Sequence, residues 1–96
     1  MWIFKYVYSN IEEIEMIDHL EWEEKILKDI DKFNANLKEL EGIEFSEKEK
    51  EALYRAIDYR KDCKYYLEKG DEITSFECIS YSHGLVDTLR IIHNII

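Results

Sequence analysis

The sequence predicts an all-α fold: an antiparallel three-helix bundle with a long first helix and an N-terminal extension. Proline is absent and glycine occurs only three times, which are too few turn residues for a strand or barrel fold. Gly42 and Gly70 each follow a long segment with helical periodicity, where a helix is expected to end. Ser46 and Glu49 have the spacing of a capping box, which marks the start of another helix.

The chain divides into an N-terminal extension, residues 1–21, and a bundle domain, residues 22–96. Residues 1–8 are aromatic and β-branched, a composition that favours a strand, yet the chain offers no second strand to pair with. We expect one of three arrangements for this segment. It is a helical extension, an arm docked on the bundle, or a strand completed by another copy.

The first helix is expected to begin after Asn10 and to continue to Glu41. Its core-facing stripe has regular helical spacing and consists of Trp22, Ile26, Ile30, Phe33, Leu37 and Leu40. The apolar residues before Trp22 are rotated relative to this stripe, so we expect a kink near residues 18 and 19 or a different partner for that half. In the connection that follows, Ile43 and Phe45 are expected to cover the end of the bundle.

The second helix is expected over residues 46–69, and Asp71 is the predicted N-cap of the third. If the chain turns at residues 70 and 71, the numbers of two residues that face each other across the second and third helices add up to about 141. The helix seam then pairs large side chains with small ones, Tyr59 with Ser82 and Tyr66 with Ser75. The exception is Cys63 opposite Cys78, where both side chains are mid-sized. The last two turns of the third helix are apolar almost all round, so one of their faces lies beneath the first helix or in an interface.

Composition and charge limit the classes of partner. The net charge of −9 makes nucleic-acid binding unfavourable. No apolar segment is long enough to span a bilayer and no cleavable signal is evident, so we expect a cytoplasmic protein that does not contact membranes. The two cysteines are then reduced thiols. We find no catalytic motif and expect neither an enzyme, a metal site nor a cofactor.

One polar group in the third helix is a candidate for chemistry. His83, Asp87 and Arg90 share a helix face at positions i, i+4 and i+7, with Tyr81 close by. Asp87 could orient the imidazole of His83, as in acid–base sites. No nucleophile is evident beside them, however, and an ion-pair ladder has the same spacing.

Three further features have a structural and a functional interpretation. Gly84 lies in mid-helix at a cost of about 1 kcal/mol relative to alanine, which predicts close approach of the first helix, another subunit or a ligand. Cys63 and Cys78 are expected to be buried free thiols. Asp58 and Asp62 lie one turn apart and are expected to form a solvated acidic patch, since a full set of metal ligands is missing.

The run YLEKGD followed by SFECISYSHGLVDTL resembles the signature of a small archaeal family, the Domain of Unknown Function 357 family. The resemblance covers roughly residues 22–93. Ser75 and Ser82 stand where that family usually has alanines. The resemblance implies a helical bundle without an established activity. The positions that match the family pattern are Tyr59, Asp62, Tyr66, Leu67, Gly70, Asp71, Tyr81, His83, Gly84 and Asp87.

Our leading hypothesis is a non-enzymatic interaction module that self-assembles, with a dimer favoured, and that can also bind another protein. The alternative is a nucleotide- or RNA-binding domain that uses Arg55, Arg60 and Lys64, with Tyr54 or Tyr65 as stacking platforms. The candidate interaction residues are Tyr59, Asp62, Tyr66, Tyr81, His83, Gly84, Asp87 and Arg90.

Overall fold

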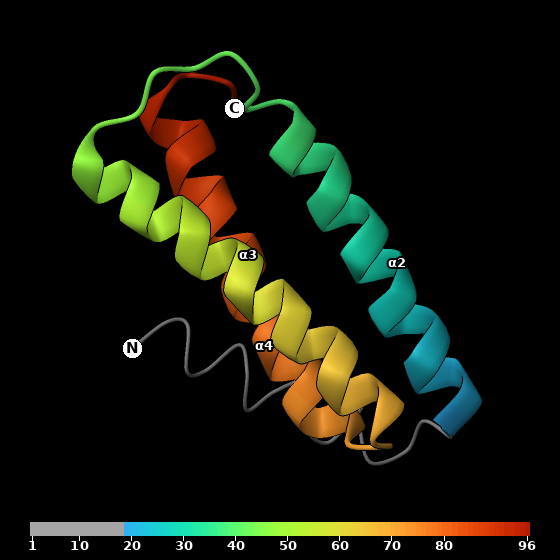
Figure 1. The fold of residues 1–96 in the computed structure, drawn as a ribbon. Coiled ribbons are helices and arrows are strands. Elements are labelled where there is room, and N and C mark those ends of the chain that lie inside the picture. Colours follow the sequence, from blue (N-terminus) through green and yellow to red (C-terminus); the bar gives the residue numbers. More distant parts are fainter. Residues whose placement is uncertain (1–18) are drawn as a thin grey trace, which may run out of the picture.

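The computed structural model of the chain describes residues 19–96, which form three helices: α2 (His19–Lys38), α3 (Glu47–Glu68) and α4 (Glu72–Ile92). α3 runs antiparallel to both α2 and α4 (Figure 1). This arrangement confirms the predicted all-α three-helix bundle. The expected course of the first helix before His19, its kink and the conformation of residues 1–8 lie outside the described residues. The end of α2 at Lys38 is three residues earlier than expected, because residues 39–42 form turns.

The ends of α3 and the start of α4 follow the predicted local chemistry. The Ser46 hydroxyl accepts from the amide of Glu49 (3.2 Å), and the Glu49 carboxylate accepts from the amide of Ser46 (2.9 Å). Gly70 has a φ of +79°, and the amide of Asp71 donates to the carbonyl of Tyr66 (2.9 Å), which is the Schellman ending of a helix. The Asp71 carboxylate then accepts from the Thr74 amide (3.1 Å) and caps α4.

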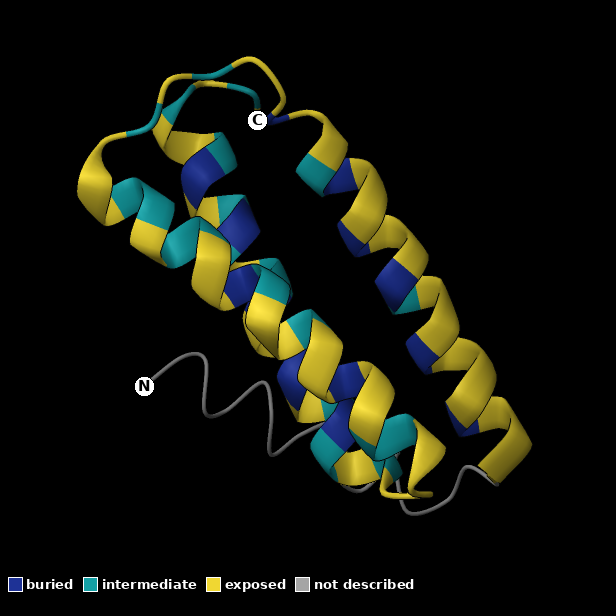
Figure 2. Ribbon diagram, viewed as in Figure 1, coloured by how far each residue is buried: buried dark blue, intermediate teal, exposed yellow. Residues whose placement is uncertain are grey.

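The core lies along the axis between the three helices, and the outer surface of each helix is exposed (Figure 2). Ile43 and Phe45 pack against this core from the α2–α3 connection, as expected. The predicted stripe of α2 forms much of its side of the core. The buried hydrophobic residues are Trp22, Ile26, Ile30, Phe33, Leu40, Ala56, Cys63, Cys78, Ile79, Val86 and Leu89.

α4 is the central helix of the bundle. It packs along both α3 and α2, whereas α2 and α3 approach each other closely at few positions. Trp22 and Phe76 illustrate the contact between α2 and α4, with ring centroids 5.3 Å apart in an edge-on arrangement. α2 reaches α3 through Asn34, whose side-chain oxygen accepts from Arg60 (2.7 Å).

Candidate functional site

The candidate residues of α4 lie on two different sides of that helix. Successive residues are rotated by about 100° around a helix, so the neighbours His83 and Gly84 cannot face the same way. His83 and Arg90 make contacts toward α2. Tyr81 and Gly84 are exposed on the outside. The structure therefore separates the predicted group into a half-buried polar part and an exposed part.

His83 fastens α4 to α2. Its Nε2 atom lies 2.7 Å from the backbone carbonyl oxygen of Asp29, so Nε2 carries the hydrogen and donates it. The imidazole also meets the ring of Phe33 edge-on, with centroids 5.8 Å apart. This contact with the Asp29 carbonyl, rather than one with Asp87, holds the imidazole.

Asp87 pairs with Arg90 instead. The Arg90 Nη1 atom lies 2.9 Å from the Asp87 carboxylate, and its Nη2 atom lies 3.0 Å from Glu39 at the end of α2. Burial disfavours the charge on Arg90, but hydrogen bonds to Asp87 and Glu39 outweigh it and raise the pKa of the guanidinium. The ion-pair alternative is thus observed for Asp87 and Arg90 within α4, and Arg90 also connects α4 to Glu39, the residue that follows α2.

The tyrosines of the predicted seam lie at the surface of α3. Tyr59 is 36% exposed and stacks at a tilt on Tyr81 of α4, with ring centroids 4.6 Å apart. Asp62 is exposed, and Tyr66 is half-buried beside the ring of Tyr65. Tyr59 and Tyr81 therefore form an aromatic pair that is open to solvent.

The seam serines are enclosed between α3 and α4 and bond to the backbone of α3. The Ser82 hydroxyl donates to the carbonyl of Ala56 (2.9 Å), and the Ser75 hydroxyl donates to the carbonyl of Cys63 (2.7 Å). Each acceptor residue lies three positions before the predicted neighbour in α3. Carbonyl groups point toward the C-terminal end of a helix, so these bonds agree with the predicted register to within a turn, and the contacts between the serines and the tyrosines stay a prediction.

Gly84 does not accommodate the described part of the first helix, which corrects the leading interpretation of this glycine for residues 19–38. Gly84 is exposed, and a Cβ atom added to it would meet no atom of residues 19–96 within 4 Å. With respect to the described residues, the space beside the α4 backbone at this point is open. The two other predicted neighbours, another subunit and a ligand, remain predictions.

Gly84 lies in the middle of a nearly uncharged surface, which we call the outward face of α4. Seven exposed residues at helical spacing form it: Ile73, Glu77, Tyr81, Gly84, Thr88, Ile91 and Ile92. Glu77 is the only charged residue among the seven, in a chain where 36% of residues are charged. The sequence indicated the apolar end of this face at Ile91, but the extension of the face to Ile73 was missed. The signal was present as the spacing 73, 77, 81, 84, 88 and 91.

Cys63 and Cys78 are free and buried, as predicted. The Cys63 thiol lies 3.2 Å from the Ser75 hydroxyl, and burial raises its pKa. Burial, reinforced by the nearby charge of Asp62, raises the pKa of Cys78 to about 11. Neither thiol has the depressed pKa of a reactive cysteine.

Residues 19–96 contain no group of three or more histidine, cysteine or acidic side chains that could hold a metal ion. In the same part of the chain, no helix is long and apolar enough to cross a bilayer. Of the basic residues in the alternative hypothesis, Arg60 is bonded to Asn34 and lies 5.5 Å from the centre of the Phe33 ring. That guanidinium therefore helps to join α3 to α2.

Comparison with known proteins agrees with the sequence resemblance. A search of curated proteins gave no match. A family model described as "Protein of unknown function (DUF357)" matches residues 28–95. This match spans α3, α4 and most of α2, and it includes every candidate residue from Tyr59 to Arg90. The chain belongs to the DUF357 family.

Proposed function

We propose that this protein is a non-enzymatic interaction module that pairs with a second copy of itself through the outward face of α4. The observation that carries the proposal is the near absence of charge from this exposed face. A chain with a net charge of −9 repels its own copies over most of its surface. Contact between copies is least opposed where the charges are missing.

The side chains of the face suit a contact between helices. Tyr81, Ile91 and Ile92 are 45%, 60% and 55% exposed, and burying apolar surface contributes about 25 cal/mol per Å². Gly84 lets another backbone approach closely, because no side chain projects from α4 at that point. A two-fold axis near Gly84 would bring the N-terminal half of each face against the C-terminal half of the other, so that Ile73 of one copy lies near the last turn of its partner.

The polar residues that could suggest catalysis support a structural role instead. His83 bonds to α2, and Arg90 bonds both to Asp87 of its own helix and to Glu39 after α2. Among the described residues of the candidate region, those on the outward face of α4 remain available to contact a partner. A different protein with an apolar helical surface could use the same face.

Sedimentation of the wild-type protein and of Gly84→Arg tests the proposal. Wild type should be a dimer at micromolar concentration. Gly84→Arg should be a folded monomer, because the new side chain enters open space in one copy but projects into the contact between two. The matched control is Ala35→Arg, which places the same side chain on an exposed site of α2 and should leave the dimer intact.

Two results would overturn the proposal. A wild-type protein that sediments as a monomer at these concentrations excludes self-association. A dimer that persists in Gly84→Arg excludes the outward face of α4 as the contact. Helix content measured by circular dichroism shows whether each variant is folded, so a loss of structure is not mistaken for dissociation.

A further inference from the structure

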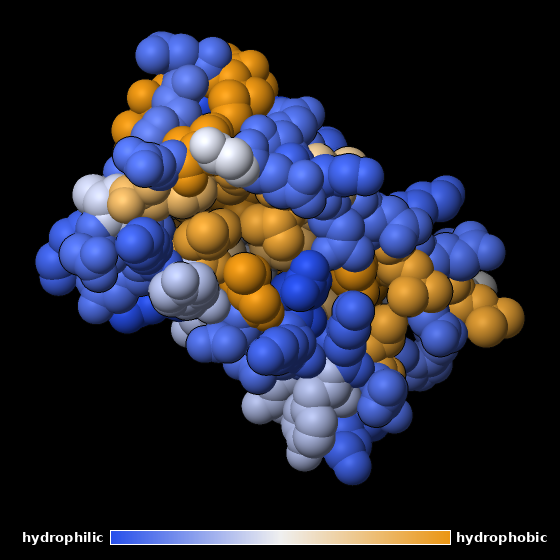
Figure 3. All heavy atoms as spheres, turned by 45° about the horizontal axis from the view of Figure 1, so that its top comes forward, coloured by the Kyte–Doolittle hydropathy of each residue, from blue (hydrophilic) through white to orange (hydrophobic). Residues whose placement is uncertain are grey.

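A second open surface lies between α2 and α3, and we call it the α2–α3 groove. It has a volume of about 460 Å³. The groove exists because α4 holds both helices while α2 and α3 meet at few positions. In the space-filling view, hydrophobic residues appear in patches bordered by hydrophilic residues (Figure 3).

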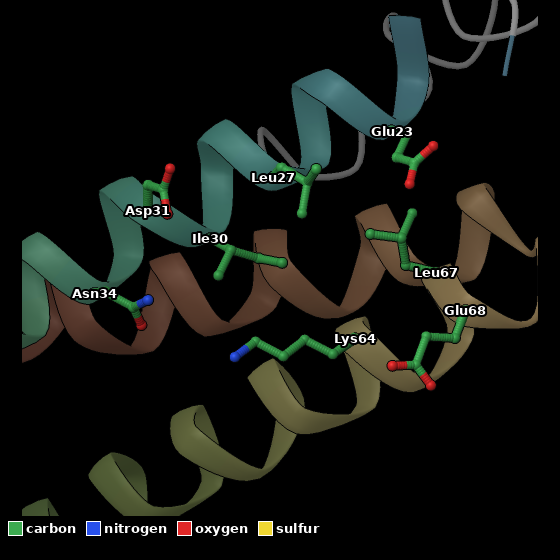
Figure 4. Close-up of a pocket in the computed structure, with 8 residues that line it drawn as sticks. All are labelled: Glu23, Leu27, Ile30, Asp31, Asn34, Lys64, Leu67 and Glu68. Carbon is green, nitrogen blue, oxygen red and sulfur yellow. The ribbon is translucent and has the colours of Figure 1, made fainter. Parts of the chain in front are cut away.

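The floor of the groove is apolar. Leu27 and Ile30 project from α2 into the space between the helices, and Leu67 projects toward them from α3 (Figure 4). Leu27 is 47% exposed although it is a large hydrophobic residue. A concave apolar surface of this size is typical of a site that takes a few large side chains.

The margin of the groove is predominantly acidic. Glu23 and Asp31 border it on α2, and Glu68 borders it on α3, whereas Lys64 is the one basic residue that lines it (Figure 4). Three carboxylates against one ammonium group favour an occupant that carries positive charge. The groove is therefore complementary to a segment that has several aromatic or aliphatic side chains and a basic residue.

We infer that residues 1–8 of the same chain occupy the α2–α3 groove. This segment, MWIFKYVY, contains aromatic and β-branched side chains and one charged side chain, that of Lys5. Trp2, Phe4 and Tyr6 supply large apolar anchors at low cost in conformational entropy. Lys5 supplies the positive charge that Glu23, Asp31 and Glu68 attract.

The chain length between the segment and the groove permits this contact. Ten residues, 9–18, separate the segment from His19, and His19 lies one turn before Glu23 at the edge of the groove. Ten residues extend to at most about 36 Å, whereas the groove follows α2 from Glu23 to Asn34, about 16 Å at 1.5 Å per residue. The connection can therefore turn back and place residues 1–8 along the whole groove.

Disulfide trapping in the full-length chain tests this inference. The double variant Phe4→Cys/Leu27→Cys should form an internal disulfide under mild oxidation, detected by mass spectrometry after alkylation of the remaining thiols. The native Cys63 and Cys78 are buried and do not compete. The matched control is Phe4→Cys/Ile91→Cys, since Ile91 is 60% exposed and lies on the outward face of α4.

The internal disulfide should form at least about tenfold faster in Phe4→Cys/Leu27→Cys than in Phe4→Cys/Ile91→Cys. A tether without a docking site gives both pairs similar effective concentrations. Adding Lys5→Glu should slow the Leu27 disulfide, because it opposes the acidic margin, whereas Lys28→Glu, which changes an exposed residue of α2 outside the groove lining, should not.

Equal rates for the two pairs, or a faster Ile91 pair, would overturn the inference. A disulfide-linked dimer through Leu27 would also overturn it, because the arm would then come from a second copy. These outcomes are independent of the proposed dimer contact. Gly84→Arg can be combined with the Leu27 pair, and a monomer should still form the internal disulfide at the wild-type rate.

Discussion

Ser75 and Ser82 are polar residues enclosed completely between α3 and α4. Each hydroxyl donates to a backbone carbonyl of α3, although those carbonyls belong to a continuous helix. Carbonyl oxygens have two lone pairs, so each can accept the serine hydroxyl in addition to the hydrogen bond within α3. Small hydroxyl residues thus let the two helices pack closely while satisfying their own polar atoms.

Replacing Ser82 by leucine should be among the most damaging single changes at the contact between α3 and α4. The larger side chain overpacks a site with no exposed surface, which costs about 1–3 kcal/mol. Urea unfolding measures this cost. Ser80→Leu, at a half-buried position on another side of α4, should cost less, and equal costs for the two variants would contradict this account of the contact.

Local signals of the sequence were reliable at this scale. The capping box at Ser46, the helix ending at Gly70 and the free thiols were all predicted, because each depends on residues close in sequence or on composition. The bond from His83 to the Asp29 carbonyl was not predictable. It depends on how far α4 is rotated relative to a helix that lies 54 residues away in the chain.

α4 is the helix against which both α2 and α3 pack. One side of it packs on α3 and another on α2, which leaves its third side outward. The apolar stripe of α2 was evident from its spacing, because one buried stripe on a charged helix is a simple pattern. The faces of α4 were harder to assign, since apolar residues surround it and periodicity cannot tell a buried face from an exposed one.

His83→Leu should weaken the attachment of α2 to α4. The leucine retains apolar contact near Phe33 but loses the hydrogen bond to the Asp29 carbonyl and the edge-on ring contact. Together these are worth about 1–2 kcal/mol. Guanidinium denaturation measures the loss. His83→Gln retains an N–H donor and should recover part of it, and a His83→Leu variant as stable as wild type would show that the bond contributes nothing.

Across the whole molecule, each of the three histidines connects two helices. His19 of α2 pairs with Glu72 of α4, His83 of α4 bonds to α2, and His93 at the end of α4 lies 2.5 Å from Glu49 of α3. Hydrogen bonds from the Ser46 amide and from His93 lower the pKa of Glu49. A hydrogen bond that the Glu72 carboxylate accepts from His19 lowers the pKa of Glu72. These pairs could not be predicted, because their partners are distant in the chain.

These two carboxylates should make the fold sensitive to acid. A carboxyl group with a depressed pKa in the folded state stabilises the fold above its ordinary pKa of 4.5, and this stability is lost as the pH falls through the lower, folded value. The free energy of unfolding should therefore decrease below about pH 4.5. Urea unfolding across pH 2–7 measures the decrease.

Glu49→Gln should flatten this pH dependence, because glutamine still accepts from the Ser46 amide but has no charge to lose. The variant should be less stable than wild type at pH 7, and the difference should vanish at the acid end of the range. The control Glu51→Gln removes a carboxylate whose partner is the exposed Lys48 and should retain most of the wild-type slope. An unchanged slope in Glu49→Gln would contradict this account.

The sparse contact between α2 and α3 has a consequence for how the native state opens. α3 and α4 are joined by a tight turn and share a long seam, so they form a hairpin with mostly local contacts. α2 is joined through a longer connection and is held mainly by α4. Partial opening of a protein follows such cooperative units. In deuterium exchange, the amides of α2 should therefore exchange together before those of the hairpin, which makes α2 the part of the bundle that detaches first.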